Sequence, residues 1–162
     1  MVINRTWLKF HEIKLKCLVY NVSIMNLISA GGIVYRKDPA AVYIVVCGRK
    51  DPRTFNLPKG TPDFGERIEE TALREVTEET GLEVKAIKYI DSVKYWVTNH
   101  PDYEGQRLHK EVFYYLMEPT GGDFSKHDDE FDTVEWVDAS KIPDILTYKN
   151  EVEIVQKGLS LV

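Results

Sequence analysis

Seven glutamates crowd into residues 66–83, and three of them are spaced so that a helix would place them side by side. The first fifteen of these residues contain no glycine or proline, apolar residues recur at helical spacing, and a glycine follows as a C-terminal stop. With about 100° of rotation per residue, Glu75, Glu78 and Glu79 span an arc of roughly 100° beside an apolar sector. The pattern predicts a helix over 66–80 with one side towards a core and the next towards a cleft.

The acidic face of this helix needs a counter-charge. Like charges three or four residues apart destabilise an isolated helix by about 0.2–0.5 kcal/mol per pair. Against the seven glutamates the segment has only Arg67 and Arg74, a local balance of −5 that equals the net charge of the whole chain. A solvated acidic face is the ordinary explanation of such a run. A divalent cation with oxygen ligands would make the spacing favourable, and this is our prediction.

The helix belongs to a longer spaced pattern. In this chain the pattern reads Gly60-x5-Glu66-x7-Arg74-Glu75-Val76-x-Glu78-Glu79-x-Gly81-Leu82. It resembles the complete Nudix box, with no departure at a fixed position. The resemblance implies an α/β fold, namely a Nudix-type α/β/α sandwich with a central mixed sheet and a loop-helix-loop catalytic motif.

The same resemblance implies a metal site and a reaction. The carbonyl of Gly60 and the carboxylates of Glu75, Glu78 and Glu79 are expected to bind Mg²⁺ or Mn²⁺, with more than one ion during turnover. A water molecule is then expected to attack a phosphorus of a nucleoside diphosphate linked to another group. This implies a phosphoanhydride hydrolase whose small-molecule substrate is a nucleotide.

Two further residues of the box have alternative roles. By resemblance, Arg74 orients a metal-binding glutamate, whereas its position one turn after Glu70 also allows a surface ion pair worth about 0–1 kcal/mol. Glu66 opens the predicted helix, where a carboxylate interacts favourably with the helix dipole. That capping role could account for Glu66 entirely.

Glu130 is the candidate catalytic residue outside the box. It precedes Glu135 by five residues, a placement at which several family members carry an additional metal-binding or water-activating glutamate. Neighbouring aspartates make a solvated acidic loop an equally good interpretation. Glu75 and Glu79 compete with Glu130 for the role of general base.

Basic residues gather ahead of the box, within it and before a later strand. They are Arg49, Lys50, Arg53, Lys59, Arg107, His109 and Lys110. Basic side chains complement phosphate oxygens, although each one alone is more often a solvated surface charge. We predict Arg49, Arg53, Lys59 and Lys110 as substrate contacts.

Aromatic residues are candidates for stacking on a nucleobase. The tyrosines considered are Tyr95, Tyr103, Tyr114 and Tyr115. We select Tyr95 and Tyr115, while noting that an aromatic residue in a strand usually belongs to a core.

Residues 57–60, Leu-Pro-Lys-Gly, suggest a substrate class. They resemble the form found in Nudix enzymes that act on dinucleoside polyphosphates, RNA 5′ ends or inositol polyphosphates. Residues 110–112 resemble diadenosine tetraphosphate hydrolases, whereas Phe55 stands where tryptophan is common. Diadenosine tetraphosphate is therefore the first expected substrate. The alternatives are a nucleoside triphosphate, an RNA 5′ end, ADP-ribose or an inositol polyphosphate, or a non-catalytic nucleotide-binding regulator.

Alternating and β-branched segments predict a sheet around the acidic helix. Strands are expected at residues 27–36, 41–48, 84–98, 111–117 and 133–137, and a last amphipathic helix at 148–158. A turn signal between the first two strands predicts that they pair like a hairpin. This order of elements fits the sandwich that the resemblance implies.

The chain of 162 residues is long enough for one domain with a substantial core. We expect this domain at residues 27–162, after an N-terminal extension, residues 1–26, that is either an added strand or a tail. Cys17 and Cys47 lie in apolar runs without metal-ligand spacing, which predicts buried thiols in a reducing compartment. The apolar run near residue 20 is too short to span a bilayer.

The net charge of −5 argues against a broad basic surface for nucleic acid. Together with the thiols and the absence of a spanning segment, it leads us to expect a cytoplasmic protein without membrane attachment. Both a monomer and a homodimer remain open.

Overall fold

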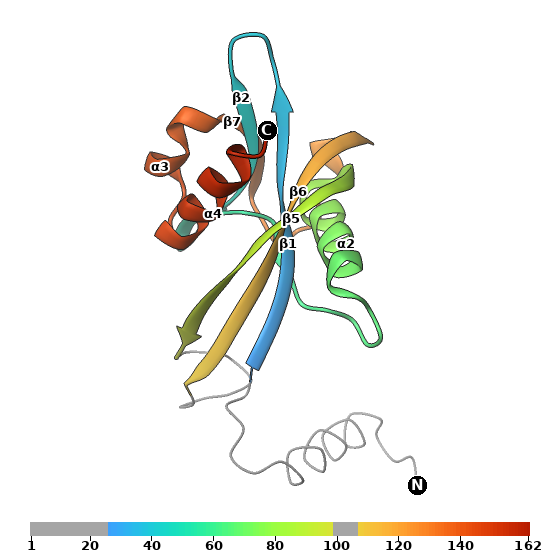
Figure 1. The fold of residues 1–162 in the computed structure, drawn as a ribbon, viewed down its shortest axis with the longest axis vertical. Coiled ribbons are helices and arrows are strands. Elements are labelled where there is room, and N and C mark those ends of the chain that lie inside the picture. Colours follow the sequence, from blue (N-terminus) through green and yellow to red (C-terminus); the bar gives the residue numbers. More distant parts are fainter. Residues whose placement is uncertain (1–25, 99–106) are drawn as a thin grey trace, which may run out of the picture.

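The computed structural model describes residues 26–98 and 107–162. It is a seven-stranded mixed sheet with helix α2 (Ile68–Thr80) on one face and helices α3 (Ile142–Ile145) and α4 (Lys149–Leu159) on the other (Figure 1). The sheet contains β1 (Asn26–Lys37), β2 (Val42–Lys50), β3 (Arg53–Asn56), β4 (Lys59–Gly60), β5 (Leu82–Val97), β6 (Leu108–Gly122) and β7 (Thr133–Asp138). Short 3-10 helices occur at η1 (Phe124–Lys126) and η2 (Ala139–Lys141). The expected α/β/α sandwich is therefore confirmed.

Two of the sequence predictions fall outside the described residues. They are the N-terminal extension up to residue 25 and the candidate tyrosine Tyr103. Within the described part of the chain, no helix is both long and apolar enough to cross a membrane.

Strand β1 joins the two halves of the sheet. It pairs in parallel with β6 from Asn26 to Val34, and its last residues pair in antiparallel fashion with β2, which confirms the hairpin-like pair. The short strand β4 also pairs with β1, through Gly31 and Lys59. A Cβ atom on Gly31 would lie 2.2 Å from the Pro58 carbonyl oxygen, so only glycine allows this approach. The loop that leads to the acidic helix is thus held against the centre of the sheet.

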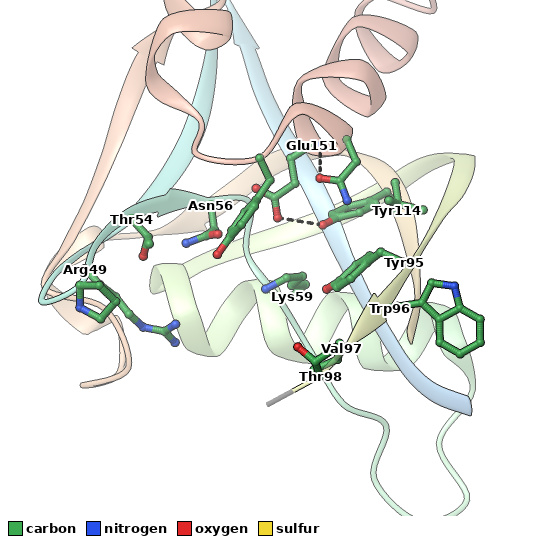
Figure 2. Close-up of a pocket in the computed structure, with 14 residues that line it drawn as sticks. Arg49, Thr54, Asn56, Lys59, Tyr95, Trp96, Val97, Thr98, Tyr114 and Glu151 are labelled. Atoms are coloured by element: carbon green, nitrogen blue, oxygen red, sulfur yellow. Dashed lines mark hydrogen bonds between the residues drawn. The ribbon is translucent and has the colours of Figure 1, made fainter. Parts of the chain in front are cut away.

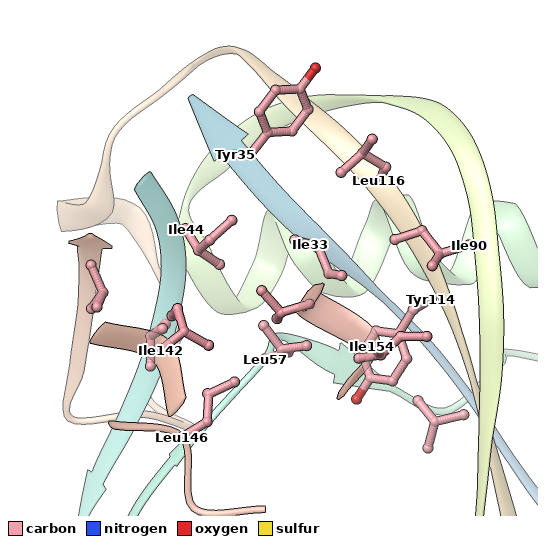
Figure 3. Packing of buried hydrophobic residues seen from close by; sticks show 14 residues of the cluster. Ile33, Tyr35, Ile44, Leu57, Ile90, Tyr114, Leu116, Ile142, Leu146 and Ile154 are labelled. Carbon is pink, nitrogen blue, oxygen red and sulfur yellow. The ribbon is translucent and has the colours of Figure 1, made fainter. Parts of the chain in front are cut away.

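Each face of the sheet has its own hydrophobic core. On one side, Ala72 and Val76 of α2 pack with residues of β1, β2 and β6. On the other side, Ile154 and Val155 of α4 join a larger cluster of buried residues (Figure 3). Helix α2 is therefore fixed by its apolar side, and its acidic side faces away from that core.

The acidic helix begins later than its sequence suggests. Arg67 is extended, with ψ of 152°, and is the N-cap residue, so the helix starts at Ile68 instead of Glu66. Glu70 accepts a hydrogen bond from the Arg67 backbone N–H at 2.9 Å and completes a capping box. The capping role considered for Glu66 is therefore wrong. At the other end, Gly81 is the left-handed C-cap with φ of 72°, as predicted.

Candidate metal and substrate site

Arg74 lies at the centre of the acidic residues of α2. Its guanidinium donates to both carboxylate oxygens of Glu66, at 2.8 and 2.9 Å, and to the Thr61 carbonyl at 3.0 Å. It also donates to Glu75 at 2.8 Å and to Glu78 at 3.0 Å. The hydrogen bonds from Arg74 are the main cause that lowers the pKa of Glu66 to about 2. Arg74 thereby ties the loop before the helix to the acidic face.

The surface pair between Arg74 and Glu70 that the spacing allowed is not formed. Glu70 instead accepts hydrogen bonds from the backbone and the guanidinium of Arg67. Arg74 contacts two of the predicted metal-binding carboxylates directly, as an orienting residue must, and that role stays a prediction.

Glu79 is only 1% exposed, although it is ionisable. Its Oε2 accepts the backbone N–H of Lys59 at 2.7 Å, while its Oε1 has no hydrogen-bond partner among the residues that the structure describes. Burial raises the pKa of this carboxyl group to about 8, and the charge of Lys59 opposes the rise. A buried oxygen without a partner is available to an external ligand.

Gly60 makes room for the Glu75 carboxylate. A Cβ atom at Gly60 would lie 2.0 Å from Glu75 Oε2, so any other residue would fill this space. Burial raises the pKa of Glu75, whereas its hydrogen bond from Arg74 lowers it. The glycine cradle, the partnerless oxygen of Glu79 and the purely oxygen donor set fit a hard divalent cation.

Within residues 26–98 and 107–162, no three acidic, histidine or cysteine side chains already converge as a metal-binding group. The reason is that Glu75 and Glu78 are turned towards Arg74. Glu78 has room to rotate because its side chain is 52% exposed. Joint coordination of a cation therefore requires these carboxylates to turn from the guanidinium.

Glu130 lies on the loop between η1 and β7, where it forms an ion pair with Arg49. Arg49 also donates to the Glu130 carbonyl at 3.1 Å, and its Cζ lies 4.5 Å from the centroid of the Phe131 ring. After burial, the charge of Glu130 is a further cause that raises the pKa of Glu75 and of Glu79. The loop thus brings Glu130 close to the helix carboxylates.

A cavity of about 610 Å³ lies beside Lys59 on the α4 side of the sheet (Figure 2). It is lined by Arg49, Pro52, Thr54, Asn56, Lys59, Val93, Tyr95, Trp96, Val97, Thr98, Tyr114, Tyr148, Asn150 and Glu151. The charge of Lys59 opposes the burial-driven rise in the pKa of both Glu79 and Glu151. Lys59 therefore lies between the carboxylate site and the floor of the cavity.

The sequence model of the family described as NUDIX domain matches residues 25–157. The chain belongs to the Nudix family. The matched range contains the whole acidic helix and nearly all of α4, so both sides of the Nudix site lie within it.

Two curated relatives illustrate the range of the family. The chain is 33% identical to an 8-oxo-(d)GTP phosphatase of Mycolicibacterium smegmatis over 138 residues, which are 80% of this chain and 40% of that protein. It is 30% identical to an RNA pyrophosphohydrolase of Novosphingobium aromaticivorans over 109 residues, which are 60% of this chain and 68% of that protein. The chain spans about half the length of the first relatives that it matches.

Solved structures show the same fold. A C. elegans Ap4A hydrolase, crystallised as a binary complex, is similar with a TM-score of 0.67 and 20% identity, covering 83% of this chain and 96% of that chain. The NUDIX domain of Shewanella oneidensis NrtR, crystallised with ADP ribose, gives a TM-score of 0.70 and 13% identity over 91% of this chain and 97% of that one. At these identities the likeness supports the Nudix fold alone.

Lys110 lies on the same side of the Nudix site as Lys59. It pairs with Tyr95 across the β5–β6 ladder, and Tyr95 lines the cavity. Burial lowers the pKa of Lys110, and the neighbouring charge of Lys59 lowers it further, while Glu130 and Glu79 oppose the shift. The structure thus brings two predicted phosphate contacts, one predicted stacking residue and the carboxylates together.

Two other predicted substrate contacts lie apart from the cavity. Arg53 does not line it, and its guanidinium lies over the ring of Phe55, 5.6 Å from the centroid. Tyr115 follows Tyr114 in β6, so strand alternation sends its side chain to the opposite face of the sheet. There its ring meets Tyr89 edge-on, with 5.4 Å between centroids. Neither side chain lines the cavity, and their roles as substrate contacts stay predictions.

Sequence reasoning missed two polar residues of the cavity floor, Asn56 and Glu151. Glu151 carried a readable signal, because it occupies the apolar stripe of α4 together with Ile154, Val155 and Gly158. An acid in such a stripe is unusual. The sequence gives no comparable signal for Asn56, because its four-residue strand is too short to show an alternation of apolar and polar residues.

Proposed function

We propose that the protein is a divalent-metal-dependent hydrolase that cleaves a phosphoanhydride bond in a nucleoside diphosphate linked to another group. The observation that carries the proposal is the Glu79 oxygen that has no partner among the described residues, buried beside the Gly60 cradle and next to a cavity with cationic residues. A buried, unsatisfied carboxylate destabilises the fold, so a protein that needed only the fold would gain nothing from it. In a catalytic metal site, the same Glu79 carboxylate would serve as a ligand of the ion.

Glu75, Glu78, Glu79 and the Gly60 carbonyl would hold Mg²⁺ or Mn²⁺, with more than one ion during turnover. When bound, the metal neutralises charge that develops on the phosphate oxygens. Without an ion, Arg74 holds Glu75 and Glu78 through its hydrogen bonds to them, and both carboxylates would turn from the guanidinium towards the metal when it binds.

The proton of the attacking water would pass to a carboxylate oxygen. Glu130 is one acceptor, because its loop brings it near the helix carboxylates, and Glu75 and Glu79 are the others. Arg49 holds the side chain of Glu130 through an ion pair and its backbone through a hydrogen bond. The loop is therefore fixed at the point where the proton acceptor must stay.

The cavity would bind the nucleoside and the cationic residues would bind the phosphates. Lys59 lies between the two regions, Arg49 lies at the edge of the cavity, and Lys110 is half-buried nearby. Tyr95 presents an aromatic surface to the cavity for stacking. In this arrangement the scissile phosphates would lie next to the carboxylates.

Dinucleoside polyphosphates are the first substrates that we propose, with diadenosine tetraphosphate as the first to test. The Leu-Pro-Lys-Gly segment at residues 57–60 supports this class. Nucleoside triphosphates are the second class, because a relative at 33% identity is an 8-oxo-(d)GTP phosphatase.

We place this activity in the cytoplasm. Cys47 is a free and buried thiol, which suits a reducing compartment. The proposed substrates are small molecules, and the proposal holds for a monomer or a homodimer.

The first test replaces the buried carboxylate. Glu79→Gln should lower turnover by roughly 10²-fold or more, because it removes a ligand of an ion that stabilises the transition state. Its melting temperature without metal should not fall, since glutamine avoids the cost of ionising a buried carboxyl group. Turnover is measured by phosphate or nucleotide release with Mg²⁺.

Glu69→Gln is the matched control, because Glu69 is exposed in the first turn of the same helix. The substrate panel contains diadenosine polyphosphates, nucleoside triphosphates, ADP-ribose and capped RNA, and isotopically labelled water reports the attacked phosphorus. Equal turnover of Glu79→Gln and the parent protein would end the proposal. Nucleotide binding without any product would instead favour a non-catalytic regulator.

A further inference from the structure

Asn56 is a buried polar residue of the cavity floor. It is 6% exposed and lies on β3, where its side chain points into the cavity beside Thr54 (Figure 2). Because Asn56 lines the cavity, its side-chain amide is accessible there and offers both donors and an acceptor to a ligand.

Glu151 lies on the same floor, at the first turn of α4. It is 4% exposed, and it accepts hydrogen bonds from the Leu57 N–H at 3.1 Å and from the Tyr114 hydroxyl at 3.3 Å. Within residues 26–98 and 107–162, no cationic side chain forms an ion pair with it. A carboxylate offers about four acceptor positions, so about two remain for a ligand.

The cavity thus changes in character from its floor to its edge. The floor presents the acceptors of Glu151 and the amide of Asn56 (Figure 2). The rings of Tyr95 and Tyr148 also line the cavity, and the cationic side chain of Lys59 leads towards the carboxylates. A ligand with a hydrogen-bonding planar group at one end and phosphates at the other matches this order. The cavity volume of about 610 Å³ lies in the range of small-molecule sites.

The chemistry of the floor distinguishes between purines. Guanine presents two adjacent donors, N1–H and the N2 amine, which match the two oxygens of one carboxylate, and it presents O6 and N7 as acceptors for an amide donor. Adenine presents one amine between two ring acceptors, and those acceptors would face carboxylate lone pairs. Sites that bind a substrate through buried polar groups reject analogues that leave those groups unpaired.

We propose that Asn56 and Glu151 are specificity-determining residues that select a guanine base, whichever phosphate chain the nucleotide carries. The proposal rests on the proposed function for the direction of the phosphates, and it deepens that function by naming the base. Within the dinucleoside class it gives preference to the guanine-containing substrate over the diadenosine form.

Base selection is tested first in turnover. The measurement is kcat/KM for GTP, ITP and ATP, and for diguanosine and diadenosine tetraphosphate, with Mg²⁺. The guanine substrate should exceed the adenine substrate by at least tenfold, with inosine between them because it lacks the N2 amine. Glu151→Gln should lower this preference at least tenfold through KM, because glutamine replaces one acceptor by a donor.

Glu153→Gln is the matched control, because Glu153 is exposed on the same helix and lies outside the cavity. It should keep the preference of the parent protein. Asn56→Ala provides a second variant, and should also weaken the guanine preference. If either variant melts at a much lower temperature, the other one decides the outcome.

Binding without turnover separates this proposal from the proposed function. The affinities of GMP, IMP and AMP are measured by calorimetry in EDTA, so that neither a metal ion nor hydrolysis contributes. Tighter binding of GMP that Glu151→Gln abolishes supports the proposal even when no nucleotide is hydrolysed. Equal affinities for the three nucleotides would overturn the proposed base selection, and so would a guanine preference that survives both variants. Hydrolysis without a base preference would overturn the base selection and leave the proposed hydrolase function intact.

Discussion

At the scale of the residue, the site contains two buried carboxylates with opposite surroundings. Among the described residues, Glu79 Oε1 has no hydrogen-bond partner, whereas both oxygens of Glu151 accept a hydrogen bond. An unsatisfied buried polar atom costs about 1–3 kcal/mol, and this cost applies to Glu79. At Glu151 the cost is the burial of the ionised form, which raises the pKa of its carboxyl group.

Gly60→Ala tests the cradle. The new methyl group would meet the Glu75 carboxylate at 2.0 Å, so either that carboxylate or the loop must move. Turnover should fall by roughly 10²-fold, because displacement of a catalytic group by about 1 Å has that effect. Steady-state kinetics with Mg²⁺ provide the measurement.

Gly121→Ala is the control for this experiment. Its new methyl group would meet only the end of the Glu83 side chain, at 2.9 Å, and that side chain can move aside. Normal turnover in Gly60→Ala would show that the space at this glycine has no role in the site.

Glu151→Gln should change the pH dependence of stability. Burial raises the pKa of Glu151 above its ordinary value of 4.5, so between these two values the folded state binds more protons than the unfolded state. The free energy of unfolding of the parent protein therefore falls as pH rises through this window, by about 1.4 kcal/mol per pKa unit. The glutamine variant lacks this loss.

Urea unfolding at pH 4.5 and pH 7 measures the effect. The variant should gain stability relative to the parent protein as pH rises, and Glu153→Gln, which changes an exposed residue, should not. A constant difference between the variant and the parent would mean that the buried carboxyl does not titrate in this range.

At the scale of the element, the acidic helix could be predicted because its signals are local. The spacing of Glu75, Glu78 and Glu79 and the C-terminal Gly81 are written within one segment. The start of the helix could not be predicted in the same way. Glu66 lies before the helix and accepts two hydrogen bonds from Arg74, which is eight residues later in the sequence. Competition between a side-chain contact and a cap decides that boundary.

Arg74 joins the helix to the loop before it, and Arg74→Lys tests this link. Lysine keeps the charge but loses the planar set of donors that reaches Glu66, Glu75, Glu78 and the Thr61 carbonyl together. Amide hydrogen exchange in residues 61–66 should become faster, and turnover should fall by roughly 10²-fold.

Arg67→Lys is the control, because Arg67 is exposed and, within the part of the chain that the structure describes, forms its ion pair with Glu70. It should leave both measurements nearly unchanged. Unaltered exchange in the loop of Arg74→Lys would show that other contacts hold it.

At the scale of the whole molecule, the long strands were predictable and the cavity was not. Long strands show their own alternation, whereas β3 and β4 are four and two residues long and depend on pairing with β2 and β1. The cavity combines side chains from β2, β3, β4, β5, β6 and α4, and these elements are spread along the sequence. Carboxylates on one helix can be located by counting, but neighbours brought together by tertiary packing cannot.

Metal binding should stabilise the entire fold. An ion that binds only the folded state raises the free energy of unfolding by about 1.4 kcal/mol for each tenfold increase in concentration above its dissociation constant. For a domain of this size the melting temperature should then rise by about 2–8 °C per decade of Mg²⁺ or Mn²⁺. Differential scanning fluorimetry measures the shift.

The shift should be much smaller in Glu79→Gln, which lacks one of the proposed ligands. If neither Mg²⁺ nor Mn²⁺ changed the melting temperature of the parent protein, the proposed metal site would be contradicted. An equal response to Ca²⁺, without turnover, would point to a structural ion.

Arg74 also determines what happens when no ion is present. Its guanidinium forms ion pairs with Glu75 and Glu78, and so neutralises the two carboxylates that would otherwise bind a metal ion. A chelator should therefore leave the protein intact and reloadable. Glu75 and Glu78 would then pair with Arg74 in the metal-free protein and with the metal ion in the loaded protein.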